Sequence, residues 1–193
     1  MDSSFIHLAT AFKLRLEQAL EVVLVLSQFD GFIQILSSEL TIKILLYPNN
    51  KTIRHHNTDP CIHIDEDQLI TKFDLIVRRI VSKTKNDKRI YARNTVVARI
   101  DKKTSLQFLV EHHLQTALPG KYRYGLYEQG ELVAVAVFSG GRRMLDKDED
   151  YRSFELLRFC NKTGINVIGG LSKLIKAFCS DFSPGDIMTF TDR

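Results

Sequence analysis

The sequence predicts a mixed α/β protein: a mixed sheet with flanking helices in residues 86–193, preceded by a small α+β extension in residues 1–85. Some segments repeat apolar residues at helical spacing, whereas others are short apolar runs bounded by turn residues. Both kinds occur on either side of a polar, basic stretch at residues 84–89. Together these observations predict two parts that each combine helices with strands, and they place the boundary in that stretch.

The composition is that of a folded protein in a reducing compartment. With 193 residues, 44% of them apolar, the chain excludes low-complexity disorder. A chain of this length buries roughly two thirds of its unfolded surface and needs no disulfide or metal staple. Cys61, Cys160 and Cys179 are odd in number and lack a CxxC pair, which excludes a disulfide scaffold. Because we find no secretory signal and no apolar run of roughly 20 residues, we expect a cytoplasmic protein with no membrane partner.

The N-terminal part is predicted to contain two helices and a pair of strands. Residues 5–28 form one amphipathic helix in this prediction, and residues 40–47 and 62–64 form strands. Residues 65–82 form the second helix, with Asp65 as its N-cap. Its predicted buried face consists of Leu69, Phe73, Ile76, Val77 and Ile80.

The C-terminal part begins with a strand at residues 95–100 and a helix at residues 102–116 that Asp101 caps. The inward face of this helix is predicted to be Leu106, Leu109, Val110 and Leu114. Strands at 122–127 and 131–138 form a hairpin around a Glu-Gln-Gly turn, and the second is apolar on both faces, as in a central strand. The remaining elements are a loop at 139–150, a strand at 154–160, a glycine turn at 164–170, a helix at 171–179 and a strand at 186–191.

Basic residues concentrate at the predicted boundary. The net charge is +4, but residues 78–103 carry a net +8 and the rest of the chain a net −4. A local basic excess favours an anionic partner such as nucleic acid or a phosphorylated cofactor. A solvated linker is the alternative explanation. The candidate nucleic-acid-binding residues are Arg78, Arg79, Lys83, Lys85, Lys88, Arg89 and Arg93.

The predicted glycine turn before the helix at 171–179 is a candidate phosphate site. A helix N-terminus presents unpaired N–H groups and a positive dipole end, and glycine lets an anion approach the backbone. Neither a Walker A motif nor a G-x-G-x-x-G motif is present. An ordinary turn that leads into a core helix is the alternative. The candidate residues are Asn166, Gly169, Gly170, Leu171, Ser172 and Lys173.

Two other clusters contain residue types that bind metal ions. The first consists of His55, His56, Asp59, Cys61 and His63, whose spacing matches no standard zinc finger. The acidic run at 146–150 lacks the glycine and the closing glutamate of a calcium-binding EF-hand loop. We therefore predict no metal site.

The glycine turn resembles the pyrophosphate loop of the N-acetyltransferase (GNAT) superfamily, whose usual form is Q/R-x-x-G-x-G/A. Asn166 stands where Gln or Arg is usual, and Leu171 stands where Gly or Ala is usual. The surrounding order of strand, helix, three strands, loop, helix and strand is similar to the first two thirds of that fold. The two last strands of the GNAT sheet have no counterpart, so the resemblance implies either a truncated fragment or a sheet closed in another way.

A longer resemblance covers residues 89–193. It is to a phage-associated domain often attached to homing-endonuclease-like proteins and, more distantly, to the Mom-type phage proteins that modify adenine in DNA. His113, Ser172 and Asp192 stand where the Mom family has a histidine, a loop serine and a strand-ending aspartate. The sequence segments that carry this resemblance are residues 89–93, 108–115, 125–127, 131–133, 155–161 and 167–174.

The resemblance implies an acyl-CoA-dependent N-acyltransferase. Acetyl-CoA or another acyl-CoA would be the acyl donor, held at the glycine turn, and a nucleobase in DNA would be an acceptor. A histidine can titrate near neutrality, so His113 would serve as acid or base, and Asp192 would orient an amine or a histidine. The alternatives are a satisfied surface or boundary residue for His113 and a cap of a following helix for Asp192. Two rival hypotheses are a non-catalytic nucleic-acid-binding domain and a degenerate or truncated GNAT fold with a structural role.

Overall fold

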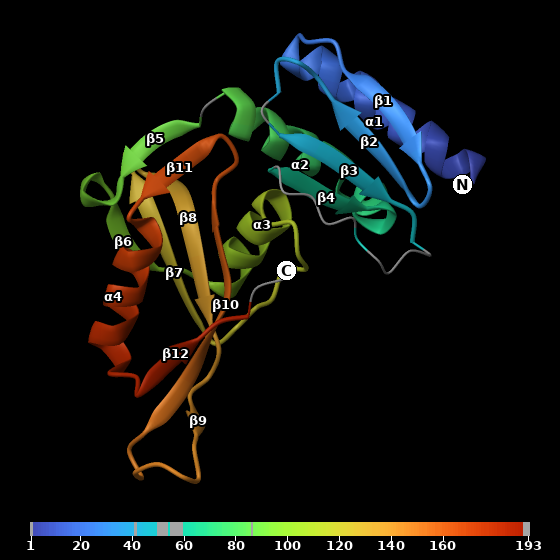
Figure 1. Cartoon of the computed structure of the whole chain (residues 1–193). Helices are drawn as coiled ribbons and strands as arrows, with labels where there is room; N and C mark the ends of the chain where they lie inside the picture. The colour runs from blue at the N-terminus through green and yellow to red at the C-terminus, as the bar shows by residue number, and fades with distance from the viewer. Residues whose placement is uncertain (1, 41, 50–53, 55–59, 86, 191–193) are drawn as a thin grey trace. The chain divides into compact units, whose positions relative to one another are not determined.

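The structure is a computed structural model that describes residues 2–40, 42–49, 54, 60–85 and 87–190 (Figure 1). The chain divides into two compact units, Met1–Asn86 and Asp87–Arg193. Each unit combines helices with a sheet, which confirms the predicted mixed α/β class. Among the described residues, no helix is both long enough and apolar enough to cross a bilayer.

The N-terminal unit is a four-stranded sheet with two helices. Its sheet has the order β1-β2-β3-β4; β1, β2 and β3 are antiparallel, and β4 runs parallel to β3. Strands β3 and β4 and the second helix confirm the predicted elements. The elements are α1 (Ser3–Leu20), β1 (Val25–Phe29), β2 (Phe32–Leu36), β3 (Lys43–Tyr47), β4 (Cys61–Asp65) and α2 (Glu66–Lys85).

The predicted helix over residues 5–28 is wrong at its C-terminal end. Helix α1 stops at Leu20, because Glu21 takes the left-handed conformation (φ 63°) and its N–H donates to the Glu17 carbonyl. The Glu17 carboxylate then accepts the Leu24 N–H at 2.8 Å, at the point where the chain turns toward β1. The β1–β2 hairpin is an addition to the predicted elements. Its Asp30-Gly31 turn is a hairpin signal, and Gly31 supplies a φ of 92°.

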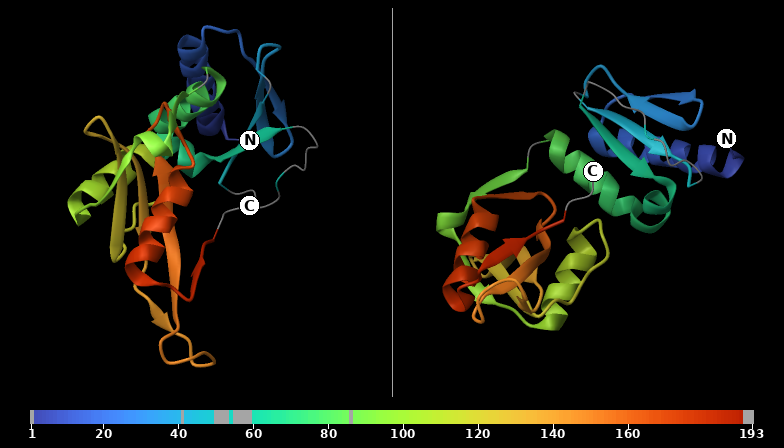
Figure 2. Two further views of the ribbon diagram at one scale, coloured as in Figure 1. Left: turned by 90° about the vertical axis from the view of Figure 1, so that its left-hand side faces the viewer. Right: turned by 60° about the horizontal axis from the view of Figure 1, so that its bottom comes forward.

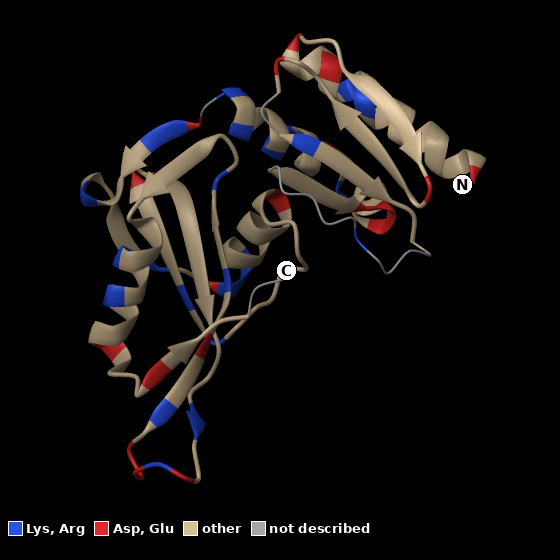
Figure 3. Ribbon diagram, in the orientation of Figure 1, with Lys and Arg blue, Asp and Glu red and all other residues tan. Residues whose placement is uncertain are grey.

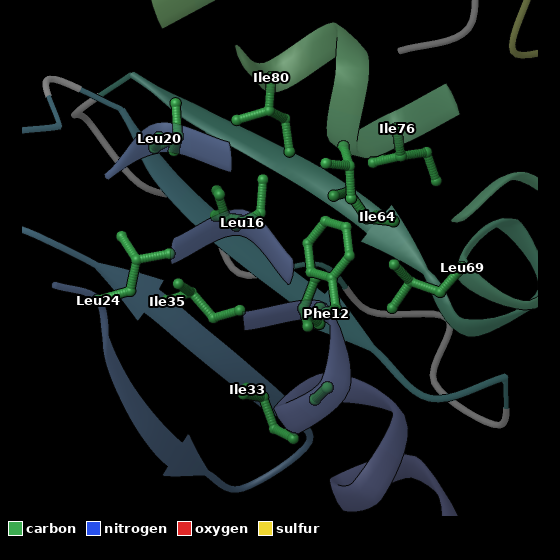
Figure 4. Close-up of a cluster of buried hydrophobic side chains, with 14 of the residues drawn as sticks. Phe12, Leu16, Leu20, Leu24, Ile33, Ile35, Ile64, Leu69, Ile76 and Ile80 are labelled. Carbon is green, nitrogen blue, oxygen red and sulfur yellow. The ribbon is translucent and has the colours of Figure 1, made fainter. Parts of the chain in front are cut away.

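Both helices of the N-terminal unit pack on the same face of its sheet (Figure 4). Phe12 and Leu16 of α1 are fully buried against Ile33 and Ile35 of β2 in this core. The predicted inward face of α2 is confirmed. Of its members, Leu69, Ile76, Val77 and Ile80 are buried, and Phe73 packs edge-on against Phe12 at 5.5 Å.

The C-terminal unit contains a main sheet with the strand order β12-β10-β8-β7-β6, and a two-stranded parallel sheet of β5 and β11. Figures 1 and 2 show both sheets with the two helices of this unit. The elements are β5 (Lys88–Tyr91), the 3-10 helix η1 (Ala92–Asn94), β6 (Val96–Arg99), α3 (Lys102–His112), β7 (Tyr122–Glu128), β8 (Glu131–Phe138), β9 (Arg142–Arg143), β10 (Arg152–Asn161), β11 (Ile165–Ile168), α4 (Gly170–Phe182) and β12 (Asp186–Met188).

The hairpin of β7 and β8 forms the middle of the main sheet, as predicted. Glu128 pairs with Glu131, and Gln129 and Gly130 between them have positive φ values of 50° and 85°. Two consecutive positive φ values are the geometry of the tight hairpin turn that matches strand twist. β8 lies between β7 and β10, and residues 133–138 are all fully buried, which confirms a central strand.

Helices α3 and α4 cover opposite faces of the main sheet. Ala134, Ala136 and Phe138 of β8 share a core with the buried residues of α4, whereas Val135 and Val137 share one with α3. This alternation is the period-2 pattern of a strand buried on both faces. The C-terminal unit is therefore a three-layer α/β/α arrangement in which β8 contributes to both cores.

The predicted inward face of α3 is wrong in part. The helix ends at His112, and its buried residues are Ser105, Phe108, Leu109 and His112, which follow an i, i+3, i+4, i+7 pattern. Of the predicted set, Leu109 is buried, but Val110 and Leu114 are about half exposed. The predicted face leaves out Phe108, whose ring lies with Leu109 in the core formed with Val135 and Val137 of β8.

A polar cluster fastens the C-terminal end of α4 to the main sheet. The buried Tyr124 of β7 donates from its hydroxyl to Asp181 Oδ2 at 2.6 Å, and Arg99 of β6 donates from Nε and Nη2 to the same oxygen at 3.1 and 2.8 Å. These hydrogen bonds lower the pKa of Asp181, and the bond from Tyr124 has the larger effect, followed by the bonds from Arg99. Burial is the main cause that raises the pKa of Tyr124 to about 12, which keeps its hydroxyl a donor.

We expect Asp181→Asn to weaken the acid sensitivity of the protein. A carboxyl whose pKa is lowered in the folded state stabilises that state above its unfolded pKa, and this contribution is lost as the pH falls below about 4. The wild-type melting temperature should therefore fall more steeply over that window than the melting temperature of Asp181→Asn, which should start lower at pH 7. Thermal unfolding followed by circular dichroism checks this, and parallel pH profiles would contradict it.

Candidate functional site

The first turn of α4 presents backbone donors at a glycine. Its N-cap is Gly169, with a φ of 76°, and among the described residues no side chain caps this end. The Lys173 N–H makes an ordinary helical bond to the Gly169 carbonyl at 3.0 Å. The N–H groups of residues 170–172 precede that bond and have no partner within the helix. This end also carries the positive pole of the helix dipole, an arrangement suited to a phosphate group.

The two glycines of this turn have different surroundings. Gly170 is buried, and a Cβ there would lie 3.1 Å from the Val167 side chain and 3.3 Å from Leu126 Cδ1. Its missing side chain lets α4 pack closely on the strands. Gly169 is exposed, and its nearest contact for a Cβ is Ala92 Cβ at 3.7 Å. Gly169 rather than Gly170 thus leaves the backbone open to an approaching ligand.

Lys173 holds α4 against η1. Its ammonium donates to the carbonyl of Ala92 at 2.7 Å and also to that of Thr95. An ammonium has three donors, so the two carbonyls take most of its hydrogen-bonding capacity. Ser172, by contrast, is exposed on the first turn. Of these two polar side chains, Ser172 is therefore the more exposed.

The predicted turn at 164–170 contains a strand. Residues 165–168 form β11, which pairs in parallel with β5, and Asn166 lies opposite Arg89. Glycines flank the strand with positive φ at Gly164 (85°) and Gly169. The segment has only four strand residues between two glycines, so its composition is that of a turn, and its pairing partner lies far away in the sequence. Asn166 itself is exposed.

Next to α4, the edge of the main sheet carries a parallel strand pair. β12 runs parallel to β10, and its pairing covers Ser153, Phe154 and Glu155. β10 continues beyond that pairing to Asn161, with a register shift between Leu156 and Arg158 on its β8 side. Such a bulge moves backbone groups out of the regular ladder and bends the strand. The parallel pair therefore covers the start of β10. The bulge lies just beyond that pairing, and β10 then continues toward β11 and the start of α4.

Of the two candidate catalytic residues, His113 and Asp192, the structure describes only His113. His113 is the C-cap of α3, where its Nδ1 accepts the Gln115 N–H at 3.0 Å. A neutral imidazole that accepts at Nδ1 carries its proton on Nε2. In that neutral form, Nε2 of His113 is a hydrogen-bond donor. Asp192 lies outside the described residues.

His112 is a buried polar residue that the sequence analysis did not single out. It is buried, and its Nδ1 lies 3.2 Å from the Thr163 hydroxyl, in the turn between β10 and β11. Its ring packs edge-on against Phe108 at 4.6 Å. His112 thus fixes the end of α3 beside the segment that leads to the start of α4. The periodicity of Ser105, Phe108 and Leu109 could have identified it, because His112 is the next position on that face.

The basic residues of the boundary segment are divided between the two units. Arg78, Arg79, Lys83 and Lys85 belong to α2, whereas Lys88, Arg89 and Arg93 belong to β5 and η1; Figure 3 shows blue bands on both α2 and β5.

Several of these cations have partners within their own unit. Lys85 lies 3.9 Å from Glu21, and Lys88 lies 3.2 Å from Glu128. Arg93 lies over the Tyr91 ring at 5.0 Å. The net charge of the segment therefore overstates the charge that a polyanion would meet.

The described residues contain no cluster of His, Cys, Asp and Glu that could hold a metal ion. His63 instead contacts the Tyr47 hydroxyl through Nδ1 and Cys61 Sγ through Nε2, both at 3.0 Å. His55, His56 and Asp59 lie outside the described residues.

Comparisons with known proteins add one weak structural similarity. A scan against protein-family models found no match, and neither did a search of curated proteins. Among solved structures, the C-terminal domain (DUF2156) of a protein described as a lysylphosphatidylglycerol synthetase from Agrobacterium fabrum aligns with a TM-score of 0.32 and 8% identity, covering 93% of this chain and 74% of that chain. A score this low does not establish a shared fold.

Proposed function

We propose that residues 87–193 act as an acyl-CoA-dependent N-acyltransferase of the GNAT type. The observation that carries this proposal is the topology of the main sheet. The antiparallel strands β6, β7, β8 and β10 are followed, through α4, by a strand parallel to β10. The resemblance implies this strand order, with the thioester held where the parallel pair diverges and the pyrophosphate held at the start of the intervening helix.

The first turn of α4 would hold the pyrophosphate of the acyl-CoA. The N–H groups of residues 170–172 would donate to its oxygens, Gly169 would let it approach, and the Ser172 hydroxyl would add one more donor. Lys173 would act mainly by keeping η1 against α4, because its ammonium already donates to two carbonyls.

The chemistry required of the protein is modest. The acceptor amine attacks the thioester carbonyl, the C–S bond breaks, and the amine loses a proton while the thiolate gains one. Most of the acceleration would come from holding the two reactants in line. Backbone N–H groups beside the bulge of β10 would stabilise the oxyanion. His113 would act as acid or base in this proton transfer, and Asp192 would orient the amine.

The acceptor proposed is an amine of a nucleobase in DNA. Its support is the resemblance to Mom-type proteins together with the basic residues of β5 and η1, which belong to the same unit as the candidate site. Because Lys88 pairs with Glu128, Arg89 and Arg93 would contribute most of the attraction on these elements. This part of the proposal is separable from acyl-CoA binding.

Calorimetry with acetyl-CoA tests the proposal directly. We expect saturable binding of acetyl-CoA and of free CoA, since both carry the pyrophosphate, and weaker binding of pantetheine, which lacks it. The absence of heat with acetyl-CoA and CoA would overturn the acyltransferase proposal. Salt-dependent DNA binding by the same protein would then favour the non-catalytic alternative.

The acceptor is tested separately by mass spectrometry. DNA incubated with the protein and acetyl-CoA is digested to nucleosides, and the expected product is adenine that has gained one acetyl group. Unmodified nucleosides from a protein that binds acetyl-CoA would overturn the choice of acceptor and leave the donor site standing.

A further inference from the structure

Helix α3 has a second face that its own unit leaves exposed. Ser105, Phe108, Leu109 and His112 face the main sheet, whereas Val110 on the other side is 58% exposed. That outer side forms a shallow hollow of about 590 Å³ with a mainly apolar floor, lined by Lys102, Lys103, Leu106, Gln107, Val110 and Glu111.

The residues of this hollow form two adjacent rows along α3. Positions 102, 106 and 110 form one row at i, i+4 spacing, with a lysine followed by Leu106 and Val110. Positions 103, 107 and 111 form the other, in which Lys103 is followed by Gln107 and Glu111. The first row supplies apolar surface. The second carries a positive charge at its N-terminal end, a neutral amide in the middle and a negative charge at its C-terminal end; in Figure 3 the negative charge is the red band on α3.

The carboxylate at the end of the second row is held on this face. Gln107 Nε2 donates to Glu111 Oε1 at 3.0 Å, within the same row. Glu111 Oε2 lies 3.8 Å from Nε2 of the neighbouring His112. The charge is therefore fixed about 12 Å along the helix from the Lys103 position, which is the rise of eight helical residues.

We propose that this face of α3 binds a second copy of the chain through an antiparallel α3–α3 contact. A two-fold axis perpendicular to α3 at Gln107 places Lys103 of each copy beside Glu111 of the other. It also brings Leu106 of each copy near Val110 of the other, and the two Gln107 amides meet on the axis. A two-fold interface requires such a self-complementary surface: if residue i of one copy contacts residue j of the other, residue j of the first copy also contacts residue i of the second. This inference does not depend on the proposed function.

The contact is small, so the dimer should be weak. A stable dimer usually buries on the order of 800 Å² per partner, and one face of an 11-residue helix offers less. We therefore expect a monomer–dimer equilibrium that shifts with protein concentration. Sedimentation equilibrium on the full chain, over a wide concentration range and at low salt, measures the dissociation constant.

Charge reversal gives the decisive test. In a dimer of Lys103→Glu, the glutamate of each copy lies beside Glu111 of the other copy. In a dimer of Glu111→Lys, the lysine of each copy lies beside Lys103 of the other copy. Each variant alone should dimerise at least about tenfold more weakly, because each repulsion occurs twice in the dimer. An equimolar mixture of the two variants restores both opposite-charge pairs and should associate about as well as wild type. Both substitutions also suit the dipole of α3, so neither should unfold it.

The matched control is Lys176→Glu, which makes the same change of charge on an exposed position of α4. It should leave the dissociation constant within about twofold of wild type, whereas Val110→Gln should weaken the dimer by removing apolar contact. A chain that stays monomeric at every concentration overturns the proposal. So does a dimer whose dissociation constant ignores the charge reversals, or variants that fail to associate when mixed.

Discussion

Ser172→Glu should weaken binding of acetyl-CoA by about a hundredfold while leaving the fold intact. The substitution puts a negative charge on the first turn of α4, beside the proposed position of the pyrophosphate, and like charges a few ångströms apart at a protein surface repel by several kcal/mol. Glutamate in the first turn suits the helix dipole, so the free energy of unfolding should not fall. Calorimetry measures the affinity, and thermal unfolding measures the stability.

Ser172→Gln is the control for this experiment. It has nearly the same size as glutamate and no charge, so it should lose no more than the contribution of the hydroxyl. Equal loss of affinity in both variants would show that bulk rather than charge matters. Unchanged affinity in Ser172→Glu would place the pyrophosphate elsewhere. Gly170 is a poor position for this test, because any side chain there would meet Val167 and Leu126 in the core.

Phe178→Ala should lower the free energy of unfolding of the C-terminal unit by about 3–5 kcal/mol, the usual cost of removing a buried aromatic ring. Phe178 is fully buried at the centre of an aromatic cluster. It stacks on Phe138 at 4.1 Å and meets Phe154 and Phe182 at 5.1 and 5.0 Å between ring centroids. Because the chain has no tryptophan, denaturant unfolding is best followed by far-UV circular dichroism.

Phe190→Ala is the matched control, since the same ring is 76% exposed there. Its effect should stay within about 0.5 kcal/mol, as for most surface substitutions. A loss of similar size at both positions would contradict the packing described for the α4 core.

The sequence correctly predicts the segments whose buried residues recur at a single spacing, either that of a helix or that of a strand. The central strand at 131–138 and the helix that contains Phe178 are examples, because each has an unambiguous apolar pattern. Prediction fails where two structures compete for the same residues. Residues 19–26 satisfy a helical pattern, yet the Glu17 carboxylate satisfies the Leu24 N–H and the chain leaves the helix there. In α3, two faces carry apolar residues, and the structure buries the one that contains Phe108.

The candidate site is predictable only in part for a related reason. Glycines before an apolar helix identify the start of α4 from the sequence alone. The sequence does not reveal that Lys173 is engaged by the carbonyls of Ala92 and Thr95, because those groups lie about 80 positions earlier in the chain. The same holds for β11, whose four residues become a strand only when β5 is beside them.

The pairing of β5 with β11 also has a consequence for the order in which the protein folds during synthesis. β5 comes first in the C-terminal unit, yet its partner is residues 165–168. Strand pairs that close such long loops form slowly, since the entropy of closure must be offset before the contact is made. The described strands of the N-terminal sheet, by contrast, find all their pairing partners within residues 1–86. Strand β5 has no partner for this pairing until residues 165–168 have been translated.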